Sequence, residues 1–188
     1  MAPFTFPTES VTFGDLLLRN EQNTELKPVL HVSEAPSNAV FPSVAIFSCC
    51  DFRFNPEELF QIKKGEAFVF STVGGNVKPC FNDLLFLETL LGNSMKEIII
   101  IHHEDCGTTR VTSQMIRENT KANSNAPALE KEIDTWQFDM HNGQNLEESV
   151  RRDLQFLRDS PYLRKELSAK ARGFVFYLKA NKLVEVKL

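Results

Sequence analysis

The chain has 188 residues, of which 42% are hydrophobic and 24% are charged, and it carries a net charge of −4 with a pI near 5.6. This length and composition are typical of a globular protein that folds as one domain, with or without an attached arm. The net negative charge argues against a nucleic-acid-binding protein, which needs a basic patch or stripe.

The first part of the sequence predicts an arm and a linker. Residues 8–19 fit a short helix capped by Thr8 or Ser10, which packs either on its own domain or on a neighbouring subunit. Residues 20–42 are polar, with regularly spaced prolines, and fit a linker. The N-terminal stretch lacks the basic and apolar segments of a secretory signal. No apolar run approaches the roughly 18 residues of a membrane span. We therefore expect no membrane association and a cytoplasmic location, or one in a non-secretory organelle.

Over the rest of the chain, short apolar runs alternate with amphipathic helical patterns. The predicted strands span residues 43–48, 66–73 and 97–102 and two runs within 171–188, and the predicted helices span 55–62, 81–92, 108–119 and 146–160. Residues 120–145 are Asn-rich and are expected to be irregular, with a short helix near 128–138. This alternation predicts an α/β fold: a central, mostly parallel β-sheet flanked by helices, with a C-terminal hairpin extension and an N-terminal helical arm.

Chemically active side chains follow two of the predicted strands. "SCCDFRFNP" places Cys49, Asp51 and Arg53 after the first strand, and "IIIIHHEDCG" places His103 and Cys106 after the third. In a parallel sheet, sites form at the carboxyl ends of the strands, so neighbouring strands would bring both groups to one edge. With no export signal, four cysteines favour metal binding or catalysis over a disulfide scaffold.

Cys49, His103 and Cys106 form a candidate metal site. Two cysteines and one histidine suit zinc, and three protein ligands with one open position are typical of catalytic zinc sites. A helix start at Cys106 would lower the pKa of its thiol, and Gly107 would let the backbone pass close to the site. Cys49 and Cys50, taken alone, would also fit buried cysteines or a vicinal disulfide.

Asp51 and Arg53 form a candidate catalytic pair beside this metal site. Arg53 would keep the Asp51 carboxylate ionised and oriented. Asp51 would then either accept a hydrogen bond from a zinc-bound water or displace that water and close the site. Zinc lowers the pKa of a bound water toward about 7, which supplies a hydroxide nucleophile at neutral pH.

The remaining polar candidates have plainer interpretations. His102 and Cys50 alternate away from the site. His102 is therefore expected to be structural or to support a metal ligand without binding the metal, and Cys50 to pack in the core or near the site. Asp105 is expected to orient its loop by hydrogen bonding. His31 and His141 lie in polar stretches and are expected to be solvated.

The spacing of these motifs resembles the β-class carbonic anhydrases of the small microbial type. The resemblance rests on C-x-D-x-R at Cys49–Asp51–Arg53 and on H-x-x-C-G at His103–Cys106–Gly107, and it continues through "KKGEAFVFSTVGGNV" and "RGFVFYLKANKLVEV". It implies one zinc per subunit, an Asp51–Arg53 dyad and the reversible hydration of carbon dioxide to bicarbonate. It also implies a homodimer or homotetramer with an N-terminal arm on the partner. On this basis we expect residues 1–188 to form a single domain, with 1–40 as arm and linker and 41–188 as the zinc-binding core.

Two departures from the family pattern leave the substrate open. Ser71-Thr72-Val73-Gly74 stands where the family usually has Arg-Asn-Ala-Gly, and Phe52 stands where a small residue is usual. We assign these five residues and Gly107 to the substrate pocket. The family includes relatives that hydrolyse carbonyl sulfide or carbon disulfide, which are linear and triatomic like carbon dioxide but less polar. Three hypotheses follow: a zinc lyase acting on carbon dioxide, a zinc hydrolase acting on carbonyl sulfide or carbon disulfide, and a zinc scaffold without activity.

Overall fold

The computed structural model describes residues 5–25, 27–29, 31–125, 127–141 and 145–188. The chain divides into two compact units, Met1–Val40 and Phe41–Leu188. That all 188 residues form one domain stays a prediction. The predicted irregular stretch 120–145 includes residues 126 and 142–144, which lie outside the described residues.

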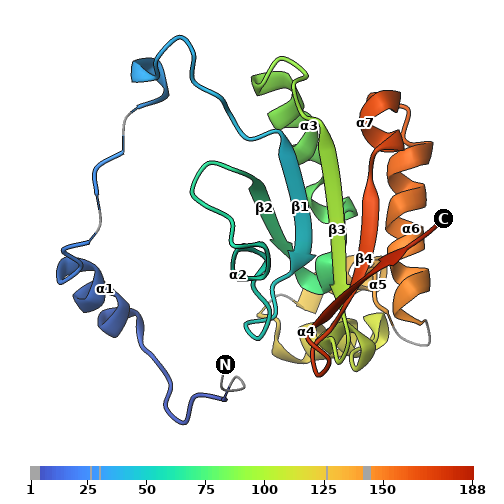
Figure 1. The fold of residues 1–188 in the computed structure, drawn as a ribbon. Helices are drawn as coiled ribbons and strands as arrows, with labels where there is room; N and C mark the ends of the chain where they lie inside the picture. The colour runs from blue at the N-terminus through green and yellow to red at the C-terminus, as the bar shows by residue number, and fades with distance from the viewer. Residues whose placement is uncertain (1–4, 26, 30, 126, 142–144) are drawn as a thin grey trace. The chain divides into compact units, whose positions relative to one another are not determined.

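The described residues of the first unit form one α-helix, α1 (Phe13–Glu21), and one turn of 3₁₀-helix, η1 (Val32–Glu34) (Figure 1). The prediction that Thr8 or Ser10 caps the first helix is wrong, because Thr12 is the N-cap. The Thr12 side chain accepts from the Asp15 backbone and the Asp15 carboxylate accepts from the Thr12 backbone. This reciprocal pairing satisfies two otherwise free backbone donors, which explains why the helix starts at Phe13.

The second unit is built on a five-stranded sheet with the order β2-β1-β3-β4-β5 (Figure 1). The strands are β1 (Val44–Cys49), β2 (Phe68–Thr72), β3 (Glu97–His103), β4 (Arg172–Tyr177) and β5 (Lys182–Val186). The first four run parallel, and β5 returns antiparallel to β4 as a hairpin. The predicted fold class is therefore confirmed, and β3 is the central strand.

The helices of this unit lie in the connections between the parallel strands. They are α2 (Pro56–Phe60), α3 (Phe81–Leu90), α4 (Ser113–Asn123), α5 (Glu130–Asp134), α6 (Leu146–Asp159) and α7 (Lys165–Ala169), with 3₁₀ turns η2 (Val73–Gly75), η3 (Lys78–Cys80), η4 (Gly107–Thr109) and η5 (Pro127–Leu129). The helix predicted over 108–119 starts later, at Ser113, because the Thr112 side chain caps it. No helix in the described part of the chain is long and apolar enough to cross a membrane.

The core has two layers because successive strand residues face opposite sides of the sheet. Ala45 and Phe47 of β1 face one side, where they pack with residues from α3, α6 and α7 such as Leu84, Leu154 and Leu167. Ile46 faces the other side, in a smaller cluster with Phe54, Ile101 and Phe176. The helices thus hold the sheet rigid behind its carboxyl edge, where Cys49 and His103 end their strands.

At Gly173 of β4 the sheet and α6 approach each other closely. A Cβ atom at this position would collide with Val150 Cγ1 and would lie 2.9 Å from Leu154 Cδ1, both on α6. We predict that Gly173→Ala lowers the free energy of unfolding by about 1–3 kcal/mol, because overpacking forces the helix away from the sheet. Urea unfolding followed by circular dichroism measures this change.

Gly14→Ala is the matched control, since its Cβ atom would lie 3.5 Å from Thr12 Oγ1, an ordinary contact. Its free energy of unfolding should stay within about 0.5 kcal/mol of the wild-type value. Equal stability of the Gly173→Ala and wild-type proteins would mean that α6 does not depend on this close approach.

Candidate metal centre

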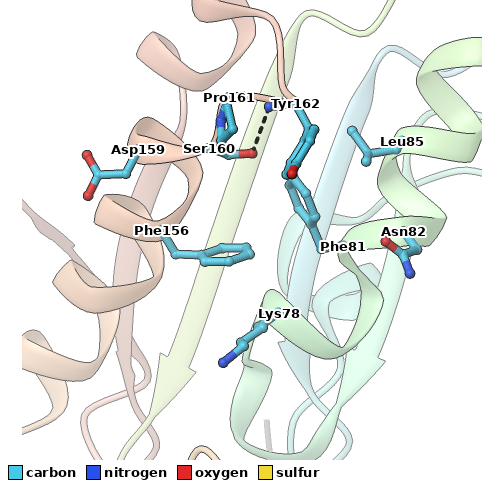
Figure 2. Close-up of a pocket in the computed structure, with 9 residues that line it drawn as sticks. All are labelled: Lys78, Phe81, Asn82, Leu85, Phe156, Asp159, Ser160, Pro161 and Tyr162. Atoms are coloured by element: carbon cyan, nitrogen blue, oxygen red, sulfur yellow. Dashed lines mark hydrogen bonds between the residues drawn. The ribbon is translucent and has the colours of Figure 1, made fainter.

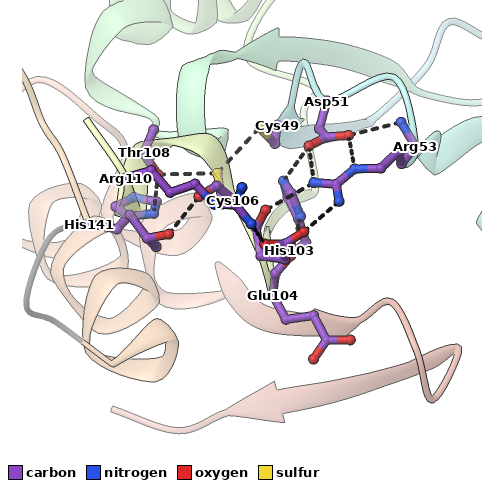
Figure 3. A network of polar contacts seen from close by, with 11 residues as sticks. Cys49, Asp51, Arg53, His103, Glu104, Cys106, Thr108, Arg110 and His141 are labelled. Carbon is purple, nitrogen blue, oxygen red and sulfur yellow. Dashed lines mark hydrogen bonds and ion pairs between the residues drawn. The ribbon is translucent and has the colours of Figure 1, made fainter. Parts of the chain in front are cut away.

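Pairing of β1 with β3 gathers three side chains that can hold a metal ion. Cys49 ends β1, His103 ends β3, and Cys106 follows three residues later. One ligand atom from each lies within 4.8 Å of the other two, and all three side chains are buried. Figure 3 shows them converging beside Asp51 and Arg53. The two sequence motifs therefore meet at one edge of the sheet.

The two sulfurs have a separation that suits zinc. Cys49 Sγ lies 3.8 Å from Cys106 Sγ. Two sulfurs bound to zinc at about 2.3 Å with a tetrahedral angle between them would be about 3.8 Å apart. Without a metal, the hydrogen bond between them stabilises one thiolate: the Cys49 contact lowers the pKa of Cys106, while that contact and burial raise the pKa of Cys49. Cys106 is thus the thiol that ionises first.

The His103 ring is oriented as a metal ligand. Its Nδ1 donates to the Glu104 carbonyl oxygen at 2.8 Å, so the other nitrogen, Nε2, faces the sulfurs. That Nε2 is buried and has no hydrogen-bond partner among the described residues. A buried nitrogen without a partner is costly, and a metal ion would satisfy it. Burial opposes protonation of His103, but the Cys106 sulfur and the Asp51 carboxylate outweigh it and raise its pKa.

The predicted helix start at Cys106 is wrong. Residues Gly107–Thr109 form a single 3₁₀ turn, and the α-helix begins only at Ser113. The Thr108 hydroxyl instead donates to Cys106 Sγ at 3.1 Å. The expected need for glycine at 107 is also not supported, because a Cβ atom there would meet nothing within 4 Å. Local hydrogen bonds, rather than a helix dipole, therefore stabilise the Cys106 thiolate.

Asp51 and Arg53 form the expected pair. Arg53 donates from Nε to Asp51 Oδ1 at 2.9 Å and from Nη2 to Oδ2 at 2.7 Å, and its backbone N–H also donates to Oδ1. These contacts hold the pKa of Asp51 below its usual range and raise that of Arg53. Asp51 Oδ2 lies 3.8 Å from His103 Nε2. The carboxylate is therefore ionised and fixed at the edge of the metal cluster.

Asp105 extends this pair into a chain of charges, in line with its expected orienting role. It accepts from Arg53 Nη1 at 2.7 Å through Oδ2, and its backbone oxygen accepts from Arg53 Nη2. Its other carboxylate oxygen pairs with Arg110. Arg53 and Arg110 lower the pKa of Asp105. Arg53 thus bridges the loops that follow β1 and β3.

The residues assigned to the substrate pocket lie in two different settings. Ser71 and Thr72 end β2 in register with Ser48 and Cys49, so Thr72 lies directly beside a candidate ligand. Thr72 is buried, whereas Ser71 is exposed. Phe52 and Val73 are exposed by 68% and 59%. Their assignment to a substrate pocket stays a prediction.

Gly74 belongs to a buried layer behind the metal cluster. Its φ angle is +78°, and a Cβ atom would lie 2.9–3.1 Å from Asn76 Nδ2, His141 Cε1 and Thr108 Cγ2. A side chain at 74 would therefore displace Asn76, Thr108 or His141. This packing explains why position 74 is a glycine, and its assignment to the substrate pocket stays a prediction.

Two expectations about single residues are wrong. His141 is not solvated: it is 1% exposed and its ring stacks on His102. Its Asn-rich surroundings carry no periodicity, so no local signal in the sequence could have placed it. Cys50 is exposed rather than packed, because β1 ends at Cys49 and the alternation of faces stops there. His31 is exposed, as expected.

His102 is structural, as expected. Its Nδ1 lies 2.7 Å from Ser149 Oγ and its Nε2 lies 3.1 Å from Asp153 Oδ2. Burial lowers its pKa. The imidazole thus anchors α6 to the sheet and faces away from the ligand cluster.

A cavity of about 640 Å³ opens between α3 and α6 (Figure 2). Phe81, Phe156 and Tyr162 supply much of its wall, and Lys78 and Asp159 lie at its margin. None of the residues that line it belongs to the metal cluster. The candidate chemistry therefore lies at the carboxyl edge of the sheet and not in this cavity.

The comparisons with known proteins agree with the fold and show the family. The profile of the family described as carbonic anhydrase matches residues 44–181. A beta-carbonic anhydrase 1 from Mycobacterium tuberculosis is 31% identical over 147 residues, which cover 76% of this chain and 81% of the relative. A carbonic anhydrase structure from Streptococcus mutans has a TM-score of 0.72 at 24% identity and covers 95% of this chain and 100% of that one. An apo carbon disulfide hydrolase has a TM-score of 0.61 at 22% identity, covering 78% and 81%, and these two likenesses concern the fold alone. The match over residues 44–181 and the identity to the mycobacterial relative establish that this chain belongs to the β-carbonic anhydrase family.

Proposed function

We propose that this protein catalyses the reversible hydration of carbon dioxide to bicarbonate with one zinc ion per subunit. The observation that carries the proposal is the buried Cys49–His103–Cys106 cluster with an ionised Asp51 held beside it. Membership of the β-carbonic anhydrase family supports the reaction class.

We further propose a homodimer or homotetramer. The exposed apolar side chains Leu16, Leu17 and Leu18 of α1 suit contact with another subunit.

Cys49, His103 and Cys106 would hold the metal. Thiolate and imidazole ligands favour zinc over magnesium or calcium, which prefer oxygen ligands. Bound in such a site, zinc lowers the pKa of a water molecule toward about 7 and supplies a nucleophile at neutral pH. The cysteines must lose their protons to bind, and the lowered pKa of Cys106 assists this step.

Asp51 would orient the reacting water. An ionised carboxylate only accepts hydrogen bonds, so a water that faces Asp51 must point a proton toward it. Arg53 occupies both carboxylate oxygens and fixes the plane of the group. The carboxylate thus acts from a set position. Because its pKa is lowered, it keeps its charge as the pH falls through the usual aspartate range.

Hydrolysis of carbonyl sulfide or carbon disulfide is the second candidate. The observation that favours it is the Ser71–Thr72 end of β2 beside Cys49, together with the exposed Phe52 after β1. These residues replace the charged and small residues usual in the family, so the approach to the metal cluster would be less polar. A less polar approach suits a softer substrate. A zinc scaffold without activity is the remaining alternative.

Cys106→Ala tests the metal site. We predict that this variant loses zinc and carbon dioxide hydration, because two protein ligands no longer hold the ion. Metal analysis and stopped-flow hydration at alkaline pH measure the two losses. Cys50→Ala is the matched control, since Cys50 is an exposed free thiol next to Cys49, and it should keep both properties. Full hydration by metal-free Cys106→Ala protein would overturn the proposal.

Asp51→Asn tests the catalytic carboxylate. The amide keeps the shape of the side chain but loses its charge, so we predict retained zinc and a fall in kcat of about 100-fold or more. Asp159→Asn, a change in an exposed carboxylate on α6, should leave kcat unchanged. If Asp51→Asn hydrates carbon dioxide at the wild-type rate, Asp51 does not orient the water.

Substitutions toward the family pattern test the substrate. We predict that Ser71→Arg/Thr72→Asn/Val73→Ala, alone or with Phe52→Ala, shifts kcat/KM toward carbon dioxide and away from carbonyl sulfide. Phe86→Ala, which removes a similarly exposed phenyl ring on α3, is the control. Unchanged ratios would mean that these positions do not set specificity. Zinc-loaded wild-type protein that turns over neither substrate would favour the scaffold.

A further inference from the structure

The hydroxyl group of Thr108 lies between His141 and Cys106 of the metal cluster. Its ring is buried, and its Nδ1 is 3.0 Å from Thr108 Oγ1. The same hydroxyl donates to Cys106 Sγ at 3.1 Å (Figure 3). The backbone adds a second link, because His141 N–H donates to the Thr108 carbonyl oxygen at 3.2 Å. Thr108 is therefore held on one side by His141 and faces a candidate ligand on the other.

Asn76 fixes the orientation of the His141 ring. The Asn76 Nδ2 donates to the carbonyl oxygens of Val73 and Asp139 at 2.8 and 2.9 Å. Carbonyl oxygens only accept hydrogen bonds, so the amide cannot flip, and its Oδ1 must face His141 Nε2 at 3.1 Å. Nε2 therefore donates to Asn76 Oδ1. Because the Thr108 hydroxyl gives its single proton to Cys106 Sγ, its oxygen accepts from His141 Nδ1, so both ring nitrogens act as donors.

The faces of the His141 ring are also confined. One face stacks on His102, with ring centroids 4.7 Å apart and planes 19° from parallel. His102 is itself held by Ser149 and Asp153. A Cβ atom on Gly74 would lie 3.0 Å from His141 Cε1, so the Gly74 main chain passes close to the edge of the ring. The contacts with Thr108, Asn76 and His102 therefore hold the buried ring in one orientation.

We propose that His141 is a positioning residue for the metal centre: it holds the Thr108 hydroxyl against Cys106 Sγ and so tunes that sulfur as a ligand. The inference rests on the metal-binding part of the proposed function. A hydrogen bond to a ligand sulfur withdraws electron density from it and fixes its direction. Contacts of this kind typically change metal affinity by about 10- to 100-fold.

Four variants separate this role from simple packing. Thr108→Val removes the hydroxyl and keeps the shape, while Thr108→Ser keeps the hydroxyl. His141→Gln places its amide where Nε2 lies and so loses the Thr108 contact, while His141→Asn places its amide where Nδ1 lies and keeps that contact. We expect Thr108→Val and His141→Gln to weaken zinc affinity about 10-fold or more in a chelator competition, and Thr108→Ser and His141→Asn to bind close to wild type.

Cobalt substitution gives a readout that packing alone would not move. The sulfur-to-cobalt charge-transfer band should shift to longer wavelength in Thr108→Val and His141→Gln, because the sulfur loses a hydrogen-bond donor. His31→Gln, a change in an exposed histidine of the first unit, should alter neither affinity nor spectrum. In the double variant, His141→Gln should cause no further loss of zinc affinity beyond that of Thr108→Val, because His141 acts through the Thr108 hydroxyl.

Different results would contradict the proposed function and the inference about His141. Wild-type protein that binds neither zinc nor cobalt overturns the proposed function. Wild-type binding with unchanged affinity and spectrum in His141→Gln overturns the inference about His141, as does a His141→Gln effect that persists in full in the Thr108→Val background. Should His141→Gln fail to fold, Thr108→Val decides alone, because unchanged metal affinity without the hydroxyl contradicts the inference.

Discussion

Parallel pairing of β1 with β3 is the contact on which the site depends. The register aligns Ser48 with Ile101, so Cys49 and His103 leave the sheet at the same edge. A shift of one residue would turn every side chain of β3 to the opposite face and would exchange His103 with His102. Buried isoleucines on both faces of β3 make such a shift costly, since Ile98 and Ile100 pack in one layer of the core and Ile101 in the other.

Charged side chains form a series that extends outward from the carboxyl edge of the sheet. The sulfurs of the candidate ligands are buried, and Asp51 lies next to them. Arg53 joins Asp51 to Asp105, which pairs in turn with Arg110. The neighbouring guanidinium groups lower the pKa of both carboxyl groups, Asp51 and Asp105. Arg53 also ties the loop after β1 to the loop after β3, so the same guanidinium that holds the carboxylate holds the two halves of the site together.

A second layer lies behind the ligands and comes from distant parts of the chain. The turn at Gly74–Asn76, the hydroxyl of Thr108 and the ring of His141 meet only because η2, η4 and the segment before α6 fold against one another. In our proposal this layer tunes Cys106 as a ligand, and it adjoins the Ser71–Val73 stretch at the end of β2.

The sequence by itself determined the class of fold, the strands and the identities of the candidate ligand side chains, because apolar runs and the two motifs are local patterns. It also pointed to the Asp51–Arg53 pair, since two residues of spacing suffice for that contact. Tertiary structure alone decided that the Cys106 thiolate is stabilised by hydrogen bonds from Cys49 and Thr108 rather than by a helix, that Cys50 faces solvent and that His141 is buried against Thr108. Each of these depends on contacts between residues far apart in the chain or on where a helix or strand ends, and neither is encoded in the composition of a short segment.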